Sequence, residues 1–263
     1  MFKKSLLIAA FFTAIYIPLQ AQQADSDQPP IYHGTSIHVD GVFITPVAGA
    51  PFSATAVIDD AQYLPDRTTN TKRTINEIGR DSRGIIHNER RRLVSEAFHG
   101  TPQLLEVHLF DPQTRMSTFY DPMTRIARQR VLPDLPKAPS LPNPANSSNS
   151  QMKVDDLGTS TLNGLDVKGL RRTFTIPAKL SGTGAAVEVV DEYWYSEDLH
   201  INLLVRRTDP RTGVQTVAIS TLKREEPAPE FFEIPQGYKT VDMTPPAGAP
   251  AVHSGFVAGS PMQ

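Results

Sequence analysis

Histidine is the residue type with the broadest catalytic and metal-binding chemistry in this sequence, which contains seven histidines and no cysteine. None of the histidines forms an HExxH motif, and no group of His, Asp and Glu residues has the spacing of a metal-ligand set. The chain also lacks a GxSxG nucleophile elbow and the phosphate-binding motifs GxxxxGK(S/T) and GxGxxG. The sequence therefore predicts no catalytic residue, no metal site and no cofactor, and it leaves a hydrolase with a dispersed site as the enzymatic alternative.

Two adjacent carboxylates, Asp191 and Glu192, stand beside the aromatic end of a predicted strand. A pair of carboxylates can act as acid and base in the cleavage of a glycosidic bond. Successive residues of a strand point to opposite faces, however, so these two side chains cannot face one another. The pattern therefore indicates an exposed acidic strand end rather than a catalytic pair.

Positive charge is concentrated in one short stretch, which contains Arg90, Arg91 and Arg92. Guanidinium groups suit contact with an anionic partner, such as a lipid head group or a polysaccharide. The alternative is that these arginines form cross-strand pairs with acidic neighbours such as Glu77 and Glu89. We favour the pairing, and keep the three arginines as a candidate anionic-partner patch.

Two predicted strands carry apolar side chains on both of their faces, one at 104–110 and one at 187–195. A strand that is apolar on both sides needs cover on both sides. The cover could be a helix, a proline-rich segment of the chain, a protein partner or an apolar ligand. The candidate ligand contacts on these strands are Trp194, Tyr193, Leu105, Val107 and Leu109.

The stretch Val187–Tyr238 has the clearest structural pattern. Period-2 alternation of apolar and polar residues predicts three antiparallel strands there, at 187–195, 199–207 and 214–223. Between the last two strands, Asp209-Pro210-Arg211-Thr212-Gly213 places a turn residue at each position, and Gly213 is expected to have a positive φ. The same Asp-Pro-x-Thr turn recurs at residues 111 and 121, which indicates repeated hairpins.

Further strands are predicted upstream, at 51–58, 72–78, 85–94, 104–110, 116–120, 126–131, 154–162 and 165–176. Asn163-Gly164 between the last two is a strong signal for a tight hairpin. A helix over 90–98 is an alternative to the third of these strands. We expect instead a strand to about Val94 and then a short helical turn that ends at Gly100. The sequence thus predicts a mainly β protein with a large antiparallel sheet and little helix.

The ends and the middle of the chain differ in composition from the predicted strands. Residues 1–21, with Lys3, Lys4 and an apolar run, have the pattern of a cleaved secretory signal peptide rather than of a membrane span. Proline, serine and asparagine dominate residues 132–152, which predicts a linker between domains or a long loop within one sheet. The expected order is a signal peptide 1–21, an extended arm 22–50, the first half of a β domain 51–131, the linker or loop 132–152, the second half 153–243 and a disordered tail 244–263.

Length and charge set broad limits on the function. The 263 residues suffice for one large β domain or two small ones, and a net charge of −2 gives no general attraction to nucleic acid. The absence of cysteine excludes disulfides and thiolate metal sites. The 23 prolines against 16 glycines favour turns and connectors over long helices. We expect an exported protein, in the periplasm or outside the cell, with no membrane span once the signal peptide is removed.

Several short motifs together resemble a family of uncharacterised secreted bacterial β proteins over residues 42–241. The ending of the pattern, Trp-Tyr-Ser followed by Asp-Pro-Arg and Phe-x-x-Pro, is also similar to periplasmic lipoprotein carriers and envelope-stress regulators. This resemblance implies a lipoprotein-carrier-like half-barrel, which is a curved, unclosed antiparallel sheet with helices across its concave side. The sequence is short of such helices, and the resemblance implies no catalytic residues. The motifs include Pro51-Phe52-Ser53-Ala54-Thr55, Asp156-Leu157-Gly158-Thr159, Glu192-Tyr193-Trp194-Tyr195-Ser196 and Phe231-Phe232-Glu233-Ile234-Pro235.

Three functions follow from these features as expectations. The first is a non-enzymatic envelope or secreted protein that binds a lipid or another apolar ligand on a curved sheet. The second is an interaction or structural module that docks other envelope proteins by its sheet edge and extended arms. The third is the hydrolase with a dispersed site.

Overall fold

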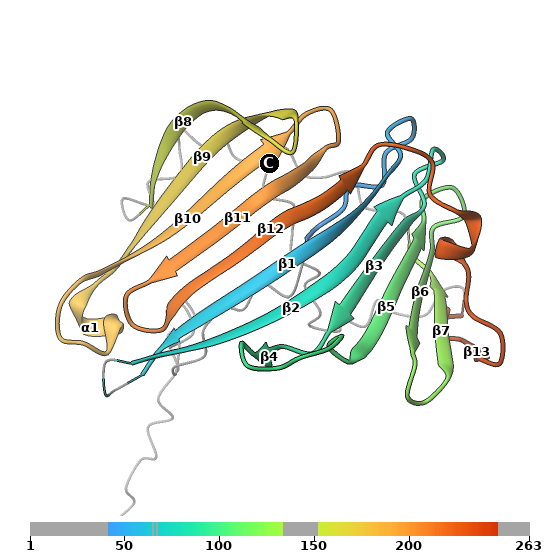
Figure 1. Ribbon diagram of the computed structural model, residues 1–263, viewed down its shortest axis with the longest axis horizontal. Coiled ribbons are helices and arrows are strands. Elements are labelled where there is room, and N and C mark those ends of the chain that lie inside the picture. Colours follow the sequence, from blue (N-terminus) through green and yellow to red (C-terminus); the bar gives the residue numbers. More distant parts are fainter. Residues whose placement is uncertain (1–41, 65, 67, 134–151, 247–263) are drawn as a thin grey trace, which may run out of the picture. The chain divides into compact units, whose positions relative to one another are not determined.

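A computed structural model describes residues 42–64, 66, 68–133 and 152–246, all within the compact unit Ser36–Gln263. The described residues form one large, curved, open sheet of 13 strands with almost no helix (Figure 1). The prediction of a mainly β fold with a large curved sheet is confirmed. The expected signal peptide, most of the arm, most of the linker or loop and the end of the tail lie outside the described residues.

The helical elements of the described residues are a single α-helical turn, α1 (Ala178–Ser181), and a 3-10 turn, η2 (Pro229–Phe232). The strands in chain order are β1 (Phe52–Tyr63), β2 (Thr69–Arg80), β3 (Ile86–Arg91), β4 (Val94–Ser95), β5 (Leu104–Asp111), β6 (Met116–Asp121), β7 (Ile126–Val131), β8 (Met152–Leu162), β9 (Leu165–Ile176), β10 (Val187–Ser196), β11 (Ile201–Asp209), β12 (Gly213–Lys223) and β13 (Lys239–Asp242).

The sheet consists of two antiparallel meanders joined side by side. Its strand order is β13-β7-β6-β5-β3-β2-β1-β12-β11-β10-β9-β8, and β4 also pairs with β2. The junction is the antiparallel ladder between β1 and β12, in which Ile58 lies opposite Val217. The pairing of β13 with β7 is parallel and departs from the antiparallel pattern.

Strand β1 defines the two faces of the sheet. Phe52, Ala54, Ala56 and Ile58 are all buried on one side, which we call the first face, and the intervening residues are half-buried on the second face. Directly paired residues of neighbouring strands share a face, so the first face continues across the β1–β12 ladder. The main hydrophobic core therefore draws on both meanders.

The described end of the N-terminal arm is fixed to the sheet by a buried arginine. Val42 and Ile44 pack into the main core. Arg80 of β2 has no exposed surface, and its guanidinium donates to the carbonyls of Thr45 (2.6 Å), Ala50 (2.9 and 2.6 Å) and Leu199 (2.9 Å). Because no carboxylate is needed to satisfy it, this cation links the arm, β2 and the β10–β11 turn through backbone oxygens.

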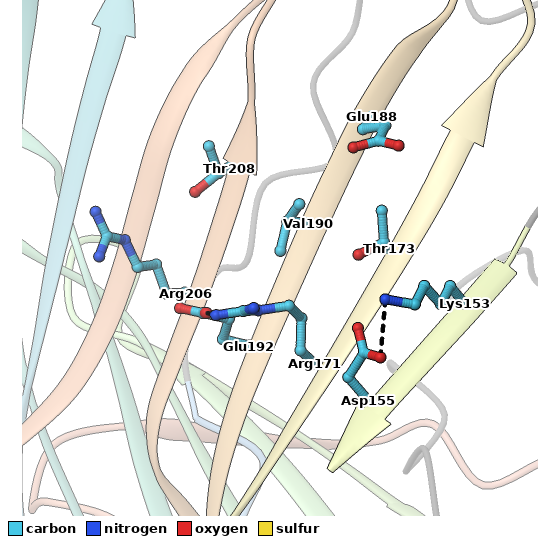
Figure 2. A pocket seen from close by; sticks show the side chains of 9 residues that line it. All are labelled: Lys153, Asp155, Arg171, Thr173, Glu188, Val190, Glu192, Arg206 and Thr208. Atoms are coloured by element: carbon cyan, nitrogen blue, oxygen red, sulfur yellow. Dashed lines mark hydrogen bonds and ion pairs between the residues drawn. The ribbon is translucent and has the colours of Figure 1, made fainter. Parts of the chain in front are cut away.

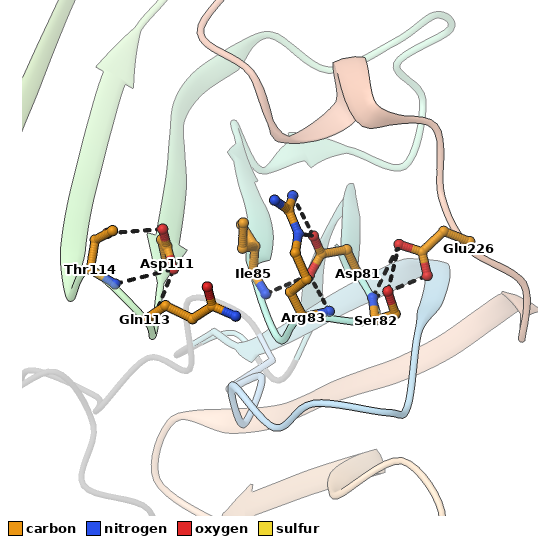
Figure 3. Close-up of polar contacts among 8 residues, drawn as sticks. All are labelled: Asp81, Ser82, Arg83, Ile85, Asp111, Gln113, Thr114 and Glu226. Carbon is orange, nitrogen blue, oxygen red and sulfur yellow. Dashed lines mark hydrogen bonds and ion pairs between the residues drawn. The ribbon is translucent and has the colours of Figure 1, made fainter.

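The segment after β12 covers part of the second face. Glu226 accepts hydrogen bonds from the backbone and side chain of Ser82 in the β2–β3 turn (Figure 3). His87 of β3 stacks on Phe231 at 3.8 Å, and its Nδ1–H donates to the Phe231 carbonyl at 2.5 Å. Farther along, Ile234 and Tyr238 pack on a second core of Val107, Leu109, Tyr120 and Ala127. Ile234 and Tyr238 of the C-terminal segment thus cover that second core.

The three Asp-Pro-x-Thr turns share one geometry. In each, the aspartate carboxylate accepts a hydrogen bond from the backbone N–H two residues later, as Asp111 does from Gln113 at 2.8 Å (Figure 3). The fifth residue has a positive φ in every case, which is 59° at Arg115, 53° at Arg125 and 132° at Gly213. The expected positive φ at Gly213 is confirmed.

The structure differs from the sequence-based expectation over the third predicted strand and the turn that follows it. Strand β3 ends at Arg91, and β4 pairs again with β2, so the strand expected to run to about Val94 is interrupted. The interruption has a visible cause, because the Asn76 side chain accepts the hydrogen bond of the Arg91 N–H that a continuous ladder would use. No helix lies between these strands and Gly100; the chain instead turns with a Phe98 N–H to Ser95 carbonyl bond of 2.9 Å.

We predict that Gly213→Val destabilises the fold by more than about 2 kcal/mol, because it combines a positive φ with a steric clash. A Cβ at Gly213 would lie 1.9 Å from the Ala61 carbonyl oxygen. Gly164→Ala is the matched control, since Gly164 has φ 74° but no atom within 4 Å of an added Cβ, and it should cost only about 1 kcal/mol. Urea denaturation measures both, and equal midpoints for the two variants would contradict the close approach of β1 to β12.

Candidate functional site

A shallow, charged hollow lies on the second face of β8–β11, near the edge of the sheet (Figure 2). Its volume is about 420 Å³, and its charged side chains alternate in sign across four adjacent strands. The alternation follows from the register, which sets Asp155, Arg171, Glu192 and Arg206 opposite one another in turn. The lining residues are Lys153, Asp155, Arg171, Thr173, Glu188, Val190, Glu192, Arg206 and Thr208.

Two ion pairs neutralise most of the charge that lines the hollow. Arg171 donates to Glu192 Oε1 at 2.9 and 2.6 Å, and Lys153 lies 3.0 Å from Asp155. Arg206 is exposed and takes part in no ion pair among the described residues. The charges and threonine hydroxyls that line the hollow suit recognition of a ligand by charge and hydrogen bonds.

The first face of the same strands carries an exposed apolar row. Met152 of β8 lies opposite Phe174 of β9, which lies opposite the buried Val189 of β10. Met152 is 49% exposed, Phe174 is 41% exposed, and Val154, two residues along β8, is 51% exposed. These are large exposed fractions for such side chains, so this row is apolar surface that the described chain leaves in water.

Beside the apolar row, the first face holds a half-buried group of charges. Asp191 lies 3.4 Å from Arg207, and the Arg172 guanidinium stacks 5.6 Å from the centre of the Tyr193 ring. Burial raises the pKa of the Asp191 carboxyl, and Arg207 and Arg172 oppose that rise. Asp191 and Glu192 lie on opposite faces with separate arginine partners, as the strand alternation predicted. The prediction of an exposed acidic strand end is wrong, because both carboxylates are half-buried in the middle of β10, where an arginine pairs with each.

The sequence-predicted ligand contacts do not come together in one place. Trp194 is half-buried against the main core, and a Cβ on Gly169 would come within 2.7 Å of its ring. Val107 and Leu109 are 0% and 7% exposed under the C-terminal segment. Leu105 and Tyr193 are half-buried, the latter beneath Arg172. The sequence analysis missed Met152, Val154 and Phe174, although the alternation Met152-Lys153-Val154-Asp155 could have indicated them.

The three adjacent arginines have separate environments. Arg91 donates to Glu89 at 2.8 Å and to the Pro102 carbonyl at 3.1 Å. Arg90 lies 3.7 Å from Glu106 on β5, and Arg92 is exposed. Glu89 also accepts from the Glu77 N–H, so the carboxylate expected to pair with the arginines does so inside a buried group.

A half-buried histidine lies on the first face of the other meander. His108 of β5 stacks on Phe119 of β6 at 4.2 Å, and its Nε2 lies 3.0 Å from Ser117 Oγ. Burial, and after it the positive charge of Arg130, lower the pKa of His108 to about 4. His108 is therefore neutral at pH 7.

We predict a pH-dependent stability that comes from His108. Between its folded pKa of about 4 and the ordinary value of 6.5, the unfolded chain binds more protons than the folded one. The stabilisation is complete above about pH 6.5 and is lost as pH falls toward 4, by up to about 3 kcal/mol. Urea denaturation across this range measures the slope. His108→Gln should remove most of it, and an unchanged slope in that variant would contradict the assignment.

Among the described residues, no three His, Asp or Glu side chains lie together as a metal site would require. Within the same residues, no helix has the length and apolar character needed to cross a membrane.

Comparisons with known proteins identify similar architectures only. No family model and no curated protein matches the sequence. A chain of the Pseudomonas aeruginosa MucA/MucB complex matches at 15% identity and a TM-score of 0.38, over 73% of this chain and 58% of that chain. This protein therefore spans little more than half of that relative.

Two further solved structures have lower scores. The LolA superfamily protein NE2245 from Nitrosomonas europaea matches at 10% identity and a TM-score of 0.29, over 72% of this chain and 92% of that one. The Mycobacterium tuberculosis lipoprotein LppX matches at 12% identity and a TM-score of 0.25, over 66% and 87%. Lipoprotein-carrier-like proteins are thus among the structural neighbours, as the sequence motifs implied, but identities and TM-scores this low carry no argument on fold, ligand or partner.

Proposed function

We propose that this is an exported, non-enzymatic binding protein of the cell envelope, and that it binds an extended segment of another protein at the β8 edge of its sheet. The observation that carries the proposal is the apolar row of Met152, Val154 and Phe174, exposed beside a strand edge that no described strand covers. An unpaired edge offers backbone hydrogen bonds, and exposed side chains next to it offer specificity.

The two edges of the sheet are not equivalent. β13 has four residues, whereas β8 has eleven. A bulge between Asp156 and Gly158, where Gly158 has φ 76°, interrupts the regular ladder of β8. Such bulges protect edges from indiscriminate pairing. The stretch available for a partner strand is therefore the regular part before the bulge, Met152–Asp156.

The side chains of this stretch define the partner. Met152 and Val154 point to the first face, whereas Lys153 and Asp155 point to the second face and line the charged hollow. A strand added beside β8 would continue both patterns, with apolar residues on the first face and charged residues on the second. The partner segment is therefore an amphipathic strand with period-2 alternation.

A lipid or another apolar ligand is the competing function, and the same exposed row supports it, together with Leu180 of α1, which is 54% exposed. Two observations weigh against a ligand on the other strands first considered. Val107 and Leu109 are buried beneath the chain's own C-terminal segment, and the main core is covered in part by the arm residues Val42 and Ile44. Micromolar binding of a fluorescent fatty acid that is lost in Phe174→Asp would favour the lipid.

We predict that a photo-crosslinking residue at Met152 forms a discrete protein adduct in the protein's own cells. Val154→Pro, which bars backbone pairing at the edge, should abolish the adduct, and Val154→Thr, which keeps strand geometry, should retain it. Met123 is the control position, because it is 71% exposed in a turn of the other meander. Equal adducts at 152 and 123, or an adduct unaffected by proline, would refute the edge as the binding site.

We also predict that the mature protein begins near Gln22, since Lys3, Lys4 and the apolar run after them have the pattern of a cleaved signal. N-terminal sequencing of protein from the envelope fraction checks this. An intact Met1 in that fraction would contradict removal of the segment.

A further inference from the structure

Strand β7 presents two arginines side by side on the first face, at the end of the sheet opposite β8. Arg128 lies opposite Phe119, which lies opposite His108, and Arg130 lies opposite Ser117. Both arginines are exposed, and neither takes part in an ion pair among the described residues. Two cations on one strand face without a carboxylate partner are an unsatisfied anion-binding surface.

The groups around these arginines leave the surface positive. Lys239 of β13 lies opposite Ile126 on the same face and is exposed. Of the acidic groups on this face, Glu106 lies 3.7 Å from Arg90. Asp121 accepts hydrogen bonds from the N–H groups of its own turn and attracts Arg128 at a longer distance than an ion pair, so it offsets one of the three positive charges. His108 is neutral at pH 7 and contributes no charge. The surface near β7 therefore has a net positive charge.

The backbone of β7 is already paired on both sides. β6 and β13 flank it, and beyond β13 the Met243 N–H donates to the Gln129 carbonyl and the Val131 N–H donates to Thr244 Oγ1. A partner cannot join the sheet here as a strand, and it can be held only by side chains. This distinguishes the β7 surface from the β8 edge.

We propose that the first face of β7 binds an acidic, extended peptide segment of a partner protein through Arg128 and Arg130. Side chains two residues apart on a strand are separated by about 6.5–7 Å, and an extended peptide repeats its own side chains at the same spacing. Glu or Asp at alternate positions would place one carboxylate on each guanidinium. Bidentate arginine–carboxylate contacts would then fix the register of the peptide.

The surface suits a peptide better than an anionic membrane. Binding to a membrane surface draws on apolar side chains that enter the acyl region as well as on cations. Of the large exposed apolar residues described near β7, Met123 lies in a turn and Val131 lies on the second face opposite Met116. Met243, which is 55% exposed just beyond β13, is then the single such side chain left to enter an acyl region. The partner is therefore acidic and polar, and this second surface is independent of the β8 edge.

The test is isothermal titration of the mature protein with a synthetic peptide of alternating Glu and Thr, and with its Gln-Thr counterpart. We expect the acidic peptide to bind with micromolar affinity that falls as salt is raised, and the neutral peptide not to bind. The double substitution Arg128→Gln and Arg130→Gln should weaken binding by about tenfold or more. Arg224→Gln, which removes an exposed arginine just after β12, outside both proposed surfaces, is the matched control and should bind as the unchanged protein does.

The pKa of His108 is a second quantity to measure, and nonspecific attraction between charges would leave it unchanged. A carboxylate bound at Arg130 offsets the positive charge that helps to lower the pKa of His108. Saturation with the acidic peptide should therefore raise that pKa in an NMR titration, as Arg130→Gln should in the free protein. Equal affinity in the double variant, an unmoved His108 titration, or binding to phosphatidylglycerol vesicles without binding to the peptide would overturn the proposal.

Discussion

The ladder between β1 and β12 is the interaction on which the rest of the structure depends. It pairs residues of the first meander with residues of the second, such as Ile58 with Val217, and so makes one sheet from two parts of the chain that are distant in sequence. The main core extends over both sides of this junction. The close approach requires Gly213 at one end, and Asn163 in the β8–β9 turn adds a 2.8 Å hydrogen bond to the Ile219 carbonyl of β12. Without the ladder, each meander would present a long, half-apolar edge strand to water.

A single sheet still has two faces, and this chain covers parts of both with its own segments. Arg80 holds the arm against the first face through the carbonyls of Thr45 and Ala50, and it also satisfies the carbonyl of the buried Leu199 in the β10–β11 turn. On the second face, His87, Glu226 and the second core hold the C-terminal segment. These contacts occupy the strands on which apolar side chains first suggested a ligand. Part of the apolar surface that remains exposed, Met152, Val154 and Phe174, lies together near β8, and for this reason we propose that a partner is recognised at the edge of the sheet.

Local patterns predicted the strands well, because alternation and turn chemistry are encoded in a few adjacent residues. The strands at 126–131 and 165–176 were predicted to the residue, and the Asp-Pro-x-Thr turns have the expected geometry. The pairing of β1 with β12 and the parallel strand β13 were not predicted, since the choice of a distant partner leaves no local mark. For the same reason, the sequence could show that Val107 and Leu109 needed cover but could not identify the cover. The sequence did not mark Arg128 and Arg130 as an anion-binding surface, because that surface depends on their neighbours on β5, β6 and β13 rather than on their own strand.

The central claim is that the chain's own segments close the apolar cores, so that a partner is held at the surface and no lipid is enclosed. Native mass spectrometry of the mature protein, purified from its own envelope without detergent, tests it most directly. We expect the mass of the polypeptide alone or with a protein partner, and no acyl lipid after gentle activation. A lipid retained at one molecule per chain, and lost in Phe174→Asp, would contradict the claim.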